Sequence, residues 1–193
     1  MRRRVIIVTD GDEVARKAVE HCGYKLGLRC ISASAGNPTP LTGSDIAELA
    51  LQAPYDPVLV MVDDKGWAGK GEGERALEAL AGDDRLEIIG AIAVASHTEH
   101  GPSTAVDSSV AGNGKIVDGA VDKAGRELPD TREITGDTVS ILSQLHLPVV
   151  IGLGDVGKMA GKDCIERGAP RTLAAIAEIM RRSGIGVGDR GRD

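Results

Sequence analysis

Short, unbroken runs of aliphatic residues most restrict how this chain can fold. A strand that is apolar on both faces is buried on both faces, as in a parallel sheet covered by helices. Segments with apolar residues at helical spacing separate the runs. We therefore predict an α/β fold with a central, mainly parallel sheet flanked by helices. The expected strands are Arg4–Val8, Leu28–Ser32, Pro57–Val62, Leu86–Ala95 and Pro148–Leu153.

The helices are predicted from periodicity and from residues that favour helix ends. Asp12 can cap a first helix in which apolar residues recur from Val14 to Cys22, and Gly23 or Gly27 ends it. A final helix over Arg171–Arg182 should bury one apolar face. That face consists of Leu173, Ile176, Ala177 and Met180, and the other expected helices are Ser44–Leu51, Glu74–Leu80 and a stretch within 135–145.

One segment interrupts the alternation of strands and helices. Ala105–Val110 and Lys115–Val121 flank Gly112-Asn113-Gly114, which is typical of a β-hairpin turn. We expect a hairpin excursion over about 104–126 that projects from the sheet and makes a protein contact, in a homo-oligomer or with a partner. Residues 1–183 should form a single domain, and 184–193 a flexible tail.

Composition excludes several function classes. The 193 residues include no Phe, one Trp and two Tyr, so aromatic platforms for single-stranded nucleic acid are not expected. A net charge of −6 gives no attraction to phosphate backbones, and we expect no nucleic-acid partner.

The same composition bears on location. No signal peptide is expected, and the longest apolar stretch, Ile88–Ala95, is far below the roughly 20 residues of a membrane span. Cys22, Cys30 and Cys164 suggest neither a disulfide framework nor a metal pair. They are expected to be reduced thiols in a cytoplasmic protein.

Acidic residues follow the expected strands repeatedly. Asp10 and Asp12 come after the first strand, Asp63 and Asp64 after the third, and Asp155 after the last. The carboxyl ends of parallel strands meet at one edge of a sheet, so these carboxylates should converge and need an offsetting charge. Mg²⁺ or Ca²⁺ held by Asp10, Asp63 and Asp155 would supply it. Alternatively, Asp12 and Asp137 are helix caps and the others form turns.

The stretch VVIGLGDVGKMAG, residues 149–161, fits two phosphate-binding patterns in part. Gly152, Gly154 and Gly157 form G-x-G-x-x-G, but no complete βαβ unit follows them. Lys158 completes a P-loop spacing, but Met159 replaces the hydroxyl residue that would hold Mg²⁺. We predict a crevice joining this loop to 9–12 and 63–64, which binds a small anion or cation without hydrolysing ATP. A tight turn packed against 9–12 is the alternative.

The segment Asp10–Val14 resembles the nucleophile loop of haloacid-dehalogenase-type phosphatases, and Ser96, Lys123 and Asp155 follow in the order of that family's other motifs. The resemblance implies that Asp10 attacks phosphorus, Asp12 is the acid or base, and Asp155 holds Mg²⁺. Met159 departs from the pattern at the second acid, and the helix expected directly after Asp12 leaves no room for a flap. A looser likeness to Toprim-type folds lies in Asp63-Asp64. Phosphotransfer is therefore the alternative function, and no catalytic residue is assigned.

Longer motifs, taken in order, cover most of the chain: TDGD (9–12), SAGNPT (34–39), DPVLVMVDD (56–64), GAIAVAS (90–96), AVDK (120–123), ITGDTV (134–139) and LPVVIGLGDVGKMAG (147–161). Together they resemble the soluble stage V sporulation protein AE family. That resemblance implies an accessory protein of the machinery that moves calcium dipicolinate in sporulation and germination. Its partners would be the membrane subunits of the dipicolinate channel, and its place the cytoplasm or the surface of the spore inner membrane. A small-ligand sensor is a third class.

Overall fold

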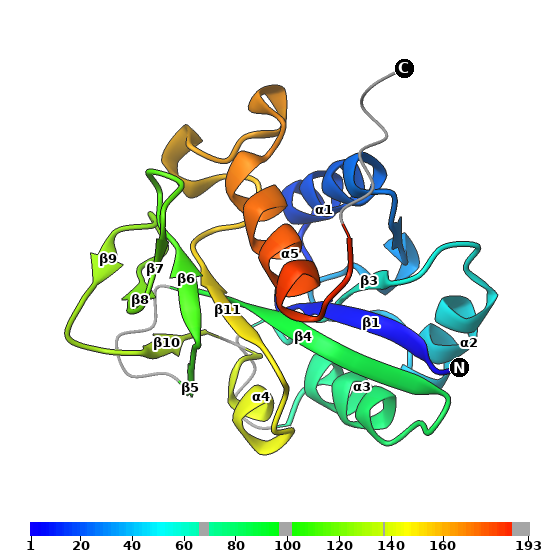
Figure 1. Ribbon diagram of the computed structural model, residues 1–193. Coiled ribbons are helices and arrows are strands. Elements are labelled where there is room, and N and C mark those ends of the chain that lie inside the picture. Colours follow the sequence, from blue (N-terminus) through cyan, green and yellow to red (C-terminus); the bar gives the residue numbers. More distant parts are fainter. Residues whose placement is uncertain (66–69, 97–101, 137, 187–193) are drawn as a thin grey trace.

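The computed structural model describes residues 1–65, 70–96, 102–136 and 138–186 (Figure 1). Within them the central sheet has seven strands in the order β2-β3-β1-β4-β11-β6-β7. All neighbouring strands are parallel except β6 and β7. The predicted α/β fold with a mainly parallel sheet is confirmed. The strands are β1 (Arg3–Val8), β2 (Arg29–Cys30), β3 (Val58–Met61), β4 (Leu86–Val94), β6 (Ser108–Val110), β7 (Ile116–Val117) and β11 (Val150–Leu153).

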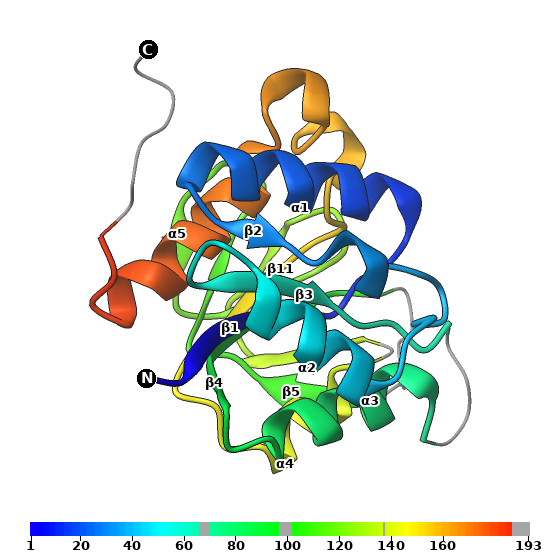
Figure 2. The same cartoon turned by 90° about the vertical axis from the view of Figure 1, so that its right-hand side faces the viewer.

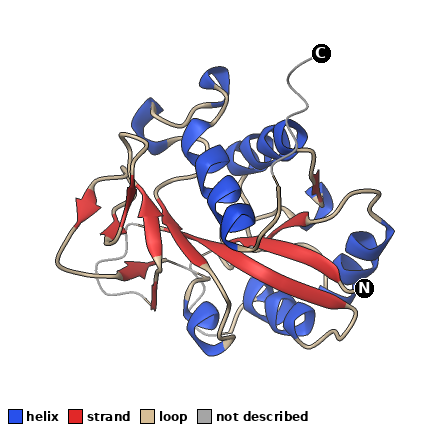
Figure 3. Cartoon of the chain, viewed as in Figure 1, coloured by secondary structure: helices blue, strands red, loops and turns tan. Residues whose placement is uncertain are grey.

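Helices cover both faces of this sheet (Figures 2 and 3). Val5 and Ile7 of β1 belong to a core with α2, α3 and α4, whereas Ile6 and Val8 belong to a core with α1 and α5. Both faces of β1 are therefore buried, which explains its unbroken apolar run. The helices are α1 (Glu13–Leu26), α2 (Gly43–Gln52), α3 (Glu72–Ala81), α4 (Ser140–Gln144) and α5 (Pro170–Arg182).

The ends of α1 agree with the sequence prediction. Asp12 is its N-cap, and Gly27 ends it with a φ of 73°. The predicted apolar face of α5 is confirmed at Ile176 and Met180, which are buried, but Leu173 and Ala177 are only partly buried. Thr172, Ala175 and Ile179 complete the buried face. On this face the Thr172 hydroxyl donates a hydrogen bond to the buried Asp163.

The excursion between β4 and α4 is longer than expected. The hairpin is present, with β6 antiparallel to β7, but β6 also pairs in parallel with β11. The hairpin thus extends the main sheet instead of projecting from it. Four further strands form two small antiparallel pairs, β5 with β10 and β8 with β9. They are β5 (Ser103–Ala105), β8 (Ala120–Val121), β9 (Glu127–Leu128) and β10 (Glu133–Thr135).

Two sequence predictions concern residues that the structure does not describe. They are the helix cap at Asp137 and positions 187–193 of the expected tail. None of the described helices has the length and apolar character that crossing a bilayer would require.

Candidate functional site: a crevice at the strand ends

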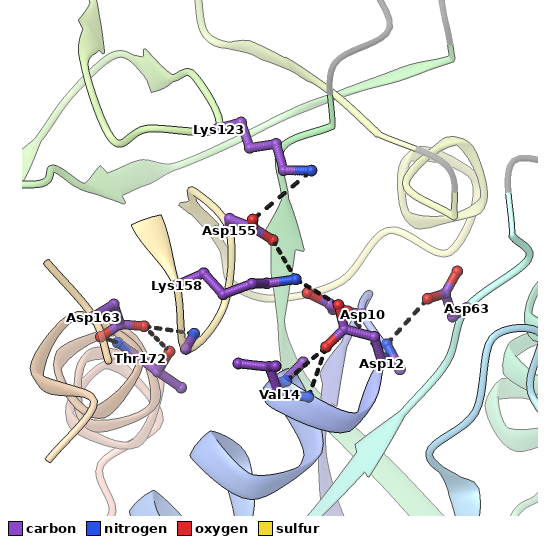
Figure 4. Close-up of polar contacts among 12 residues, drawn as sticks. Asp10, Asp12, Val14, Asp63, Lys123, Asp155, Lys158, Asp163 and Thr172 are labelled. Carbon is purple, nitrogen blue, oxygen red and sulfur yellow. Dashed lines mark hydrogen bonds and ion pairs between the residues drawn. The ribbon is translucent and has the colours of Figure 1, made fainter. Parts of the chain in front are cut away.

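A crevice of about 120 Å³ opens at the carboxyl ends of the central strands. The strands β3 and β4 lie on opposite sides of β1, so the chain changes its winding direction at this point. Such a switch point is the usual position for a ligand in an open α/β sheet. Five of the predicted site residues line it, and Figure 4 shows their polar contacts. The lining residues are Thr9, Asp10, Asp12, Asn37, Asp63, Val94, Ala95, Ser96, Lys123, Asp155 and Lys158.

Lys158 joins the two walls of the crevice. Its Nζ lies 2.5 Å from Asp12 Oδ2, after β1, and 3.1 Å from Asp155 Oδ1, after β11. Partial burial acts to lower the pKa of Lys158, but the hydrogen bonds to Asp12 and Asp155 outweigh it and raise the pKa above its usual value. Lys158 is therefore a charged bridge. Lys123 Nζ approaches the other oxygen of Asp155 at 3.8 Å.

Asp12 has two structural duties. Its Oδ1 accepts hydrogen bonds from the backbone N–H groups of Val14 and Ala15, at 2.9 and 2.8 Å, and its Oδ2 receives Lys158. Burial would raise the pKa of Asp12, but these hydrogen bonds lower it below its ordinary value. Asp12 is thus an ionised cap, and both of its oxygens are engaged in hydrogen bonds.

Asp10 behaves differently from the other acids. Its residue is only 9% exposed, and its Oδ1 accepts a 3.3 Å hydrogen bond from the Asp12 backbone. Burial, helped by the charge of Asp12, raises the pKa of Asp10 from 3.8 to about 7. Lys158 offsets part of this increase. Asp10 can therefore gain or lose a proton near neutral pH inside the crevice.

The neighbouring acids Asp63 and Asp64 point to different places. Asp63 Oδ2 accepts from Gly11 N at 3.1 Å, which ties the loop after β3 to the loop after β1. Asp64 lies outside the crevice, where its Oδ1 accepts from Gly73 N at 2.6 Å and caps the first turn of α3. The structure therefore brings Asp63, but not Asp64, to the predicted site.

The glycines of the 149–161 stretch serve packing. A Cβ on Gly152 would lie 2.2 Å from Ser109 Oγ, and one on Gly154 would lie 2.7 Å from the Lys123 carbonyl. Gly157 has a φ of +71° and donates its N–H to Asp163 at 3.0 Å. None of the three lines the crevice. The loop places Asp155 and Lys158 at the crevice, and ligand binding by its three glycines stays a prediction.

Asp163 was missed by sequence reasoning. It is fully buried and accepts hydrogen bonds from Gly157 N, Arg171 N, Thr172 N and the Thr172 hydroxyl, at 3.0, 2.7, 3.1 and 2.5 Å. It thereby fixes the Lys158 loop to the N-terminus of α5. The sequence offered only an indirect signal. The helix begins at Pro170, and the preceding Ala169 has no side-chain acceptor for the first backbone N–H groups. A carboxylate from another part of the chain can take that place.

The predicted metal set is not assembled as the side chains stand. In the described ranges, no three His, Cys, Asp or Glu side chains are grouped as a metal ion would require. Asp155 faces Lys158, while Asp63 accepts from backbone N–H groups. A cation at Asp10, Asp63 and Asp155 stays a prediction, and it requires the lysine bridge to open.

Comparison with protein families gives a match over residues 4–183 to the sequence model of stage V sporulation protein AE1. The chain belongs to this family. The AE1 match covers every crevice residue and extends through the last helix. Membership in the AE1 family implies a function in sporulation. Comparisons with curated proteins and with solved structures gave no match.

Replacing Lys158 tests the electrostatics of the crevice in this AE1 family member. Lys158→Ala should raise the pKa of Asp10 further above 7, because a cation that lowers it is removed. The fold should persist, since an ion pair with side chains 34% and 35% exposed contributes at most about 1 kcal/mol. Carboxyl ¹³C titration by NMR measures the change, with Lys115→Ala, an exposed lysine outside the crevice, as the matched control. An unchanged Asp10 titration would contradict the assigned role of Lys158.

Proposed function

We propose that this protein is a non-catalytic, ligand-binding accessory protein of the calcium dipicolinate transport machinery in sporulation and germination. Family membership supports the sporulation role. The transport role follows from the resemblance set out above, with the channel's membrane subunits as partners and the inner membrane surface as the place of action. The observation that carries ligand binding is the strand-end crevice, where the buried, titratable Asp10 lies beside a charged lysine bridge.

The geometry supports binding of a divalent cation by exchange. The ammonium group of Lys158 already occupies a cation position between Asp12 and Asp155. Calcium prefers several oxygen ligands, and displacement of Lys158 would expose these two carboxylates next to Asp10. Asp10 would lose its proton in the process, since a nearby cation favours the carboxylate. Calcium uptake should therefore release protons near neutral pH.

The same contacts argue against the phosphotransfer alternative. Asp12, the expected acid or base, is held by two backbone N–H groups and by Lys158. Met159, which stands in place of the second acid, is fully buried. Asp155 is paired with lysines. Asp10 therefore lacks the free partner that a phosphoryl-transfer cycle needs.

Titration calorimetry with calcium chloride, dipicolinate and their equimolar mixture tests this function. We expect the mixture or calcium alone to bind the wild-type protein, with proton release detected in buffers of different ionisation enthalpy. Asp10→Asn should weaken binding by about tenfold or more, because a charge-assisted contact is lost. Asp84→Asn, an exposed acid outside the crevice, is the matched control.

Two outcomes would overturn the proposal. The first is a wild-type protein that responds to none of the three probes. The second is hydrolysis of an aryl phosphate with Mg²⁺ that Asp10→Asn abolishes, because that result would favour the enzymatic alternative.

A further inference from the structure

A larger basin of about 570 Å³ lies beside the crevice. Ala95, Ser96 and Lys123 line both hollows, so the two are adjacent. The crevice, at about 120 Å³, has room for an ion or a few waters. The basin falls within the roughly 300–1,000 Å³ of pockets that hold small organic molecules. A small organic molecule therefore fits the basin and not the crevice.

The wall of the basin is held by hydrogen bonds from other parts of the chain. Asp155 N donates to the Lys123 carbonyl at 2.9 Å, and Lys162 Nζ donates to the Ala124 carbonyl at 3.1 Å. Within the excursion, Gly112 N donates to Gly125 O at 2.7 Å. The bonds from Asp155 and Lys162 tie the excursion to the loop that carries Lys158, so the basin borders the same site.

The basin is lined by two basic and two acidic residues, and the two basic ones are placed to meet an anion. Lys123 and Arg126 line it, and Arg126 is exposed to an incoming ligand. The acid Asp122 serves its own turn, since its Oδ1 accepts from Ala124 N at 2.8 Å and Arg126 N at 2.9 Å. Glu133 is exposed, where solvent screens its charge.

Apolar side chains supply the rest of the lining. Val121 is buried in the wall, and Leu128 is 39% exposed toward solvent although it is a large aliphatic residue. Together with the two cations, this lining suits a ligand with a compact apolar body and a carboxylate or phosphate group.

We propose that the basin and the crevice form one extended site for a small organic anion. Lys123 and Arg126 bind its acidic group, Val121 and Leu128 contact its body, and its other end reaches Asp10. Lys123 is suited to this task because it is only 3.8 Å from Asp155, so it can contact both the ligand and the crevice wall. This assignment rests on the proposed ligand-binding function and names the class of ligand.

Calorimetry with isophthalate, benzoate, inorganic phosphate and the neutral isophthalamide tests the assignment. Isophthalate should bind most tightly, and isophthalamide should not bind. Lys123→Gln and Arg126→Gln should each weaken isophthalate binding by about tenfold. Glu133→Gln should change it little, because solvent screens the charge of Glu133. Lys115→Gln, in the hairpin turn outside the basin, should leave it unchanged.

The failure of this inference differs from the failure of the proposed function. Three results would overturn the assignment of the basin. They are an isophthalate affinity of Lys123→Gln equal to that of the wild type, an affinity for phosphate equal to that for isophthalate, and no binding of any organic anion. Amide NMR shifts should fall on 121–128 when isophthalate is added. Shifts confined to 10–14 and 155–158 would also overturn the assignment of the basin, but they would leave the crevice as a binding site. The calcium titration decides the proposed function separately.

Discussion

The Asp163→Ala protein should unfold at a much lower denaturant concentration than the wild type. The wild-type carboxylate is fully buried and accepts four hydrogen bonds from Gly157, Arg171 and Thr172. Its removal leaves these donors without an acceptor in a site closed to water. A single unsatisfied buried donor costs about 1–3 kcal/mol, so we expect a loss of about 3 kcal/mol or more in the free energy of unfolding.

Two variants make this result specific. Asp163→Asn keeps one acceptor oxygen but turns an amide N–H₂ toward existing donors, so its loss should be intermediate. Asp130→Ala, an exposed acid of the excursion, should stay close to the wild type. Chemical denaturation measures all three proteins. A loss below about 1 kcal/mol for Asp163→Ala would mean that water replaces the carboxylate, and that α5 does not depend on it.

Asp10→Asn should have the opposite effect and make the protein more stable above about pH 7. Burial and the charge of Asp12 raise the pKa of Asp10 from 3.8 to about 7, so the folded protein prefers the neutral acid. Asparagine imitates that neutral form at every pH. The difference between the two pKa values corresponds to at most about 4 kcal/mol, and we expect about 2–4 kcal/mol of stabilisation.

The pH dependence follows from proton linkage. Below pH 3.8 both the folded and unfolded forms carry the Asp10 proton, and the neutral carboxyl contributes its full stability. Between 3.8 and about 7 the folded protein keeps a proton that the unfolded chain has released, so stability falls as the pH rises. The advantage of Asp10→Asn should therefore be near zero at low pH and reach its limit above about pH 7.

Unfolding curves collected across this pH range measure the effect. A constant difference between Asp10→Asn and the wild type would contradict the raised pKa of Asp10. A gain in stability together with a loss of ligand binding would show that Asp10 is kept for function at a cost in stability.

The sequence predicted the scaffold because local patterns determine it. The apolar run of β1 has both faces buried, and Asp12 and Gly27 bound α1 through short-range contacts. The place of β6 could not be predicted in this way. Its neighbour β11 lies more than thirty residues further along the chain, and a hairpin turn does not specify that partner.

For the site, the sequence predicted which residues lie at the strand ends but not where each side chain points. Strand ends gather Asp10, Asp12, Asp63, Asp155 and Lys158, as parallel topology requires. The adjacent acids Asp63 and Asp64 contact different loops because their side chains point in different directions, and residue spacing does not reveal this. The G-x-G-x-x-G pattern does not by itself specify a phosphate site. Glycine permits close approach of any group, and here that group is Ser109 or the Lys123 backbone instead of a phosphate.

The Lys158 bridge has a consequence for protein synthesis. Lys158 and Asp12 are 146 residues apart, so the two halves of the crevice leave the ribosome at very different times. The early nascent chain carries Asp10 and Asp12 without the lysine that balances them. Only after the loop and its anchor at α5 have emerged can the crevice close. A chain that ends before Lys158 should therefore lack the closed crevice, whatever ligand the crevice takes.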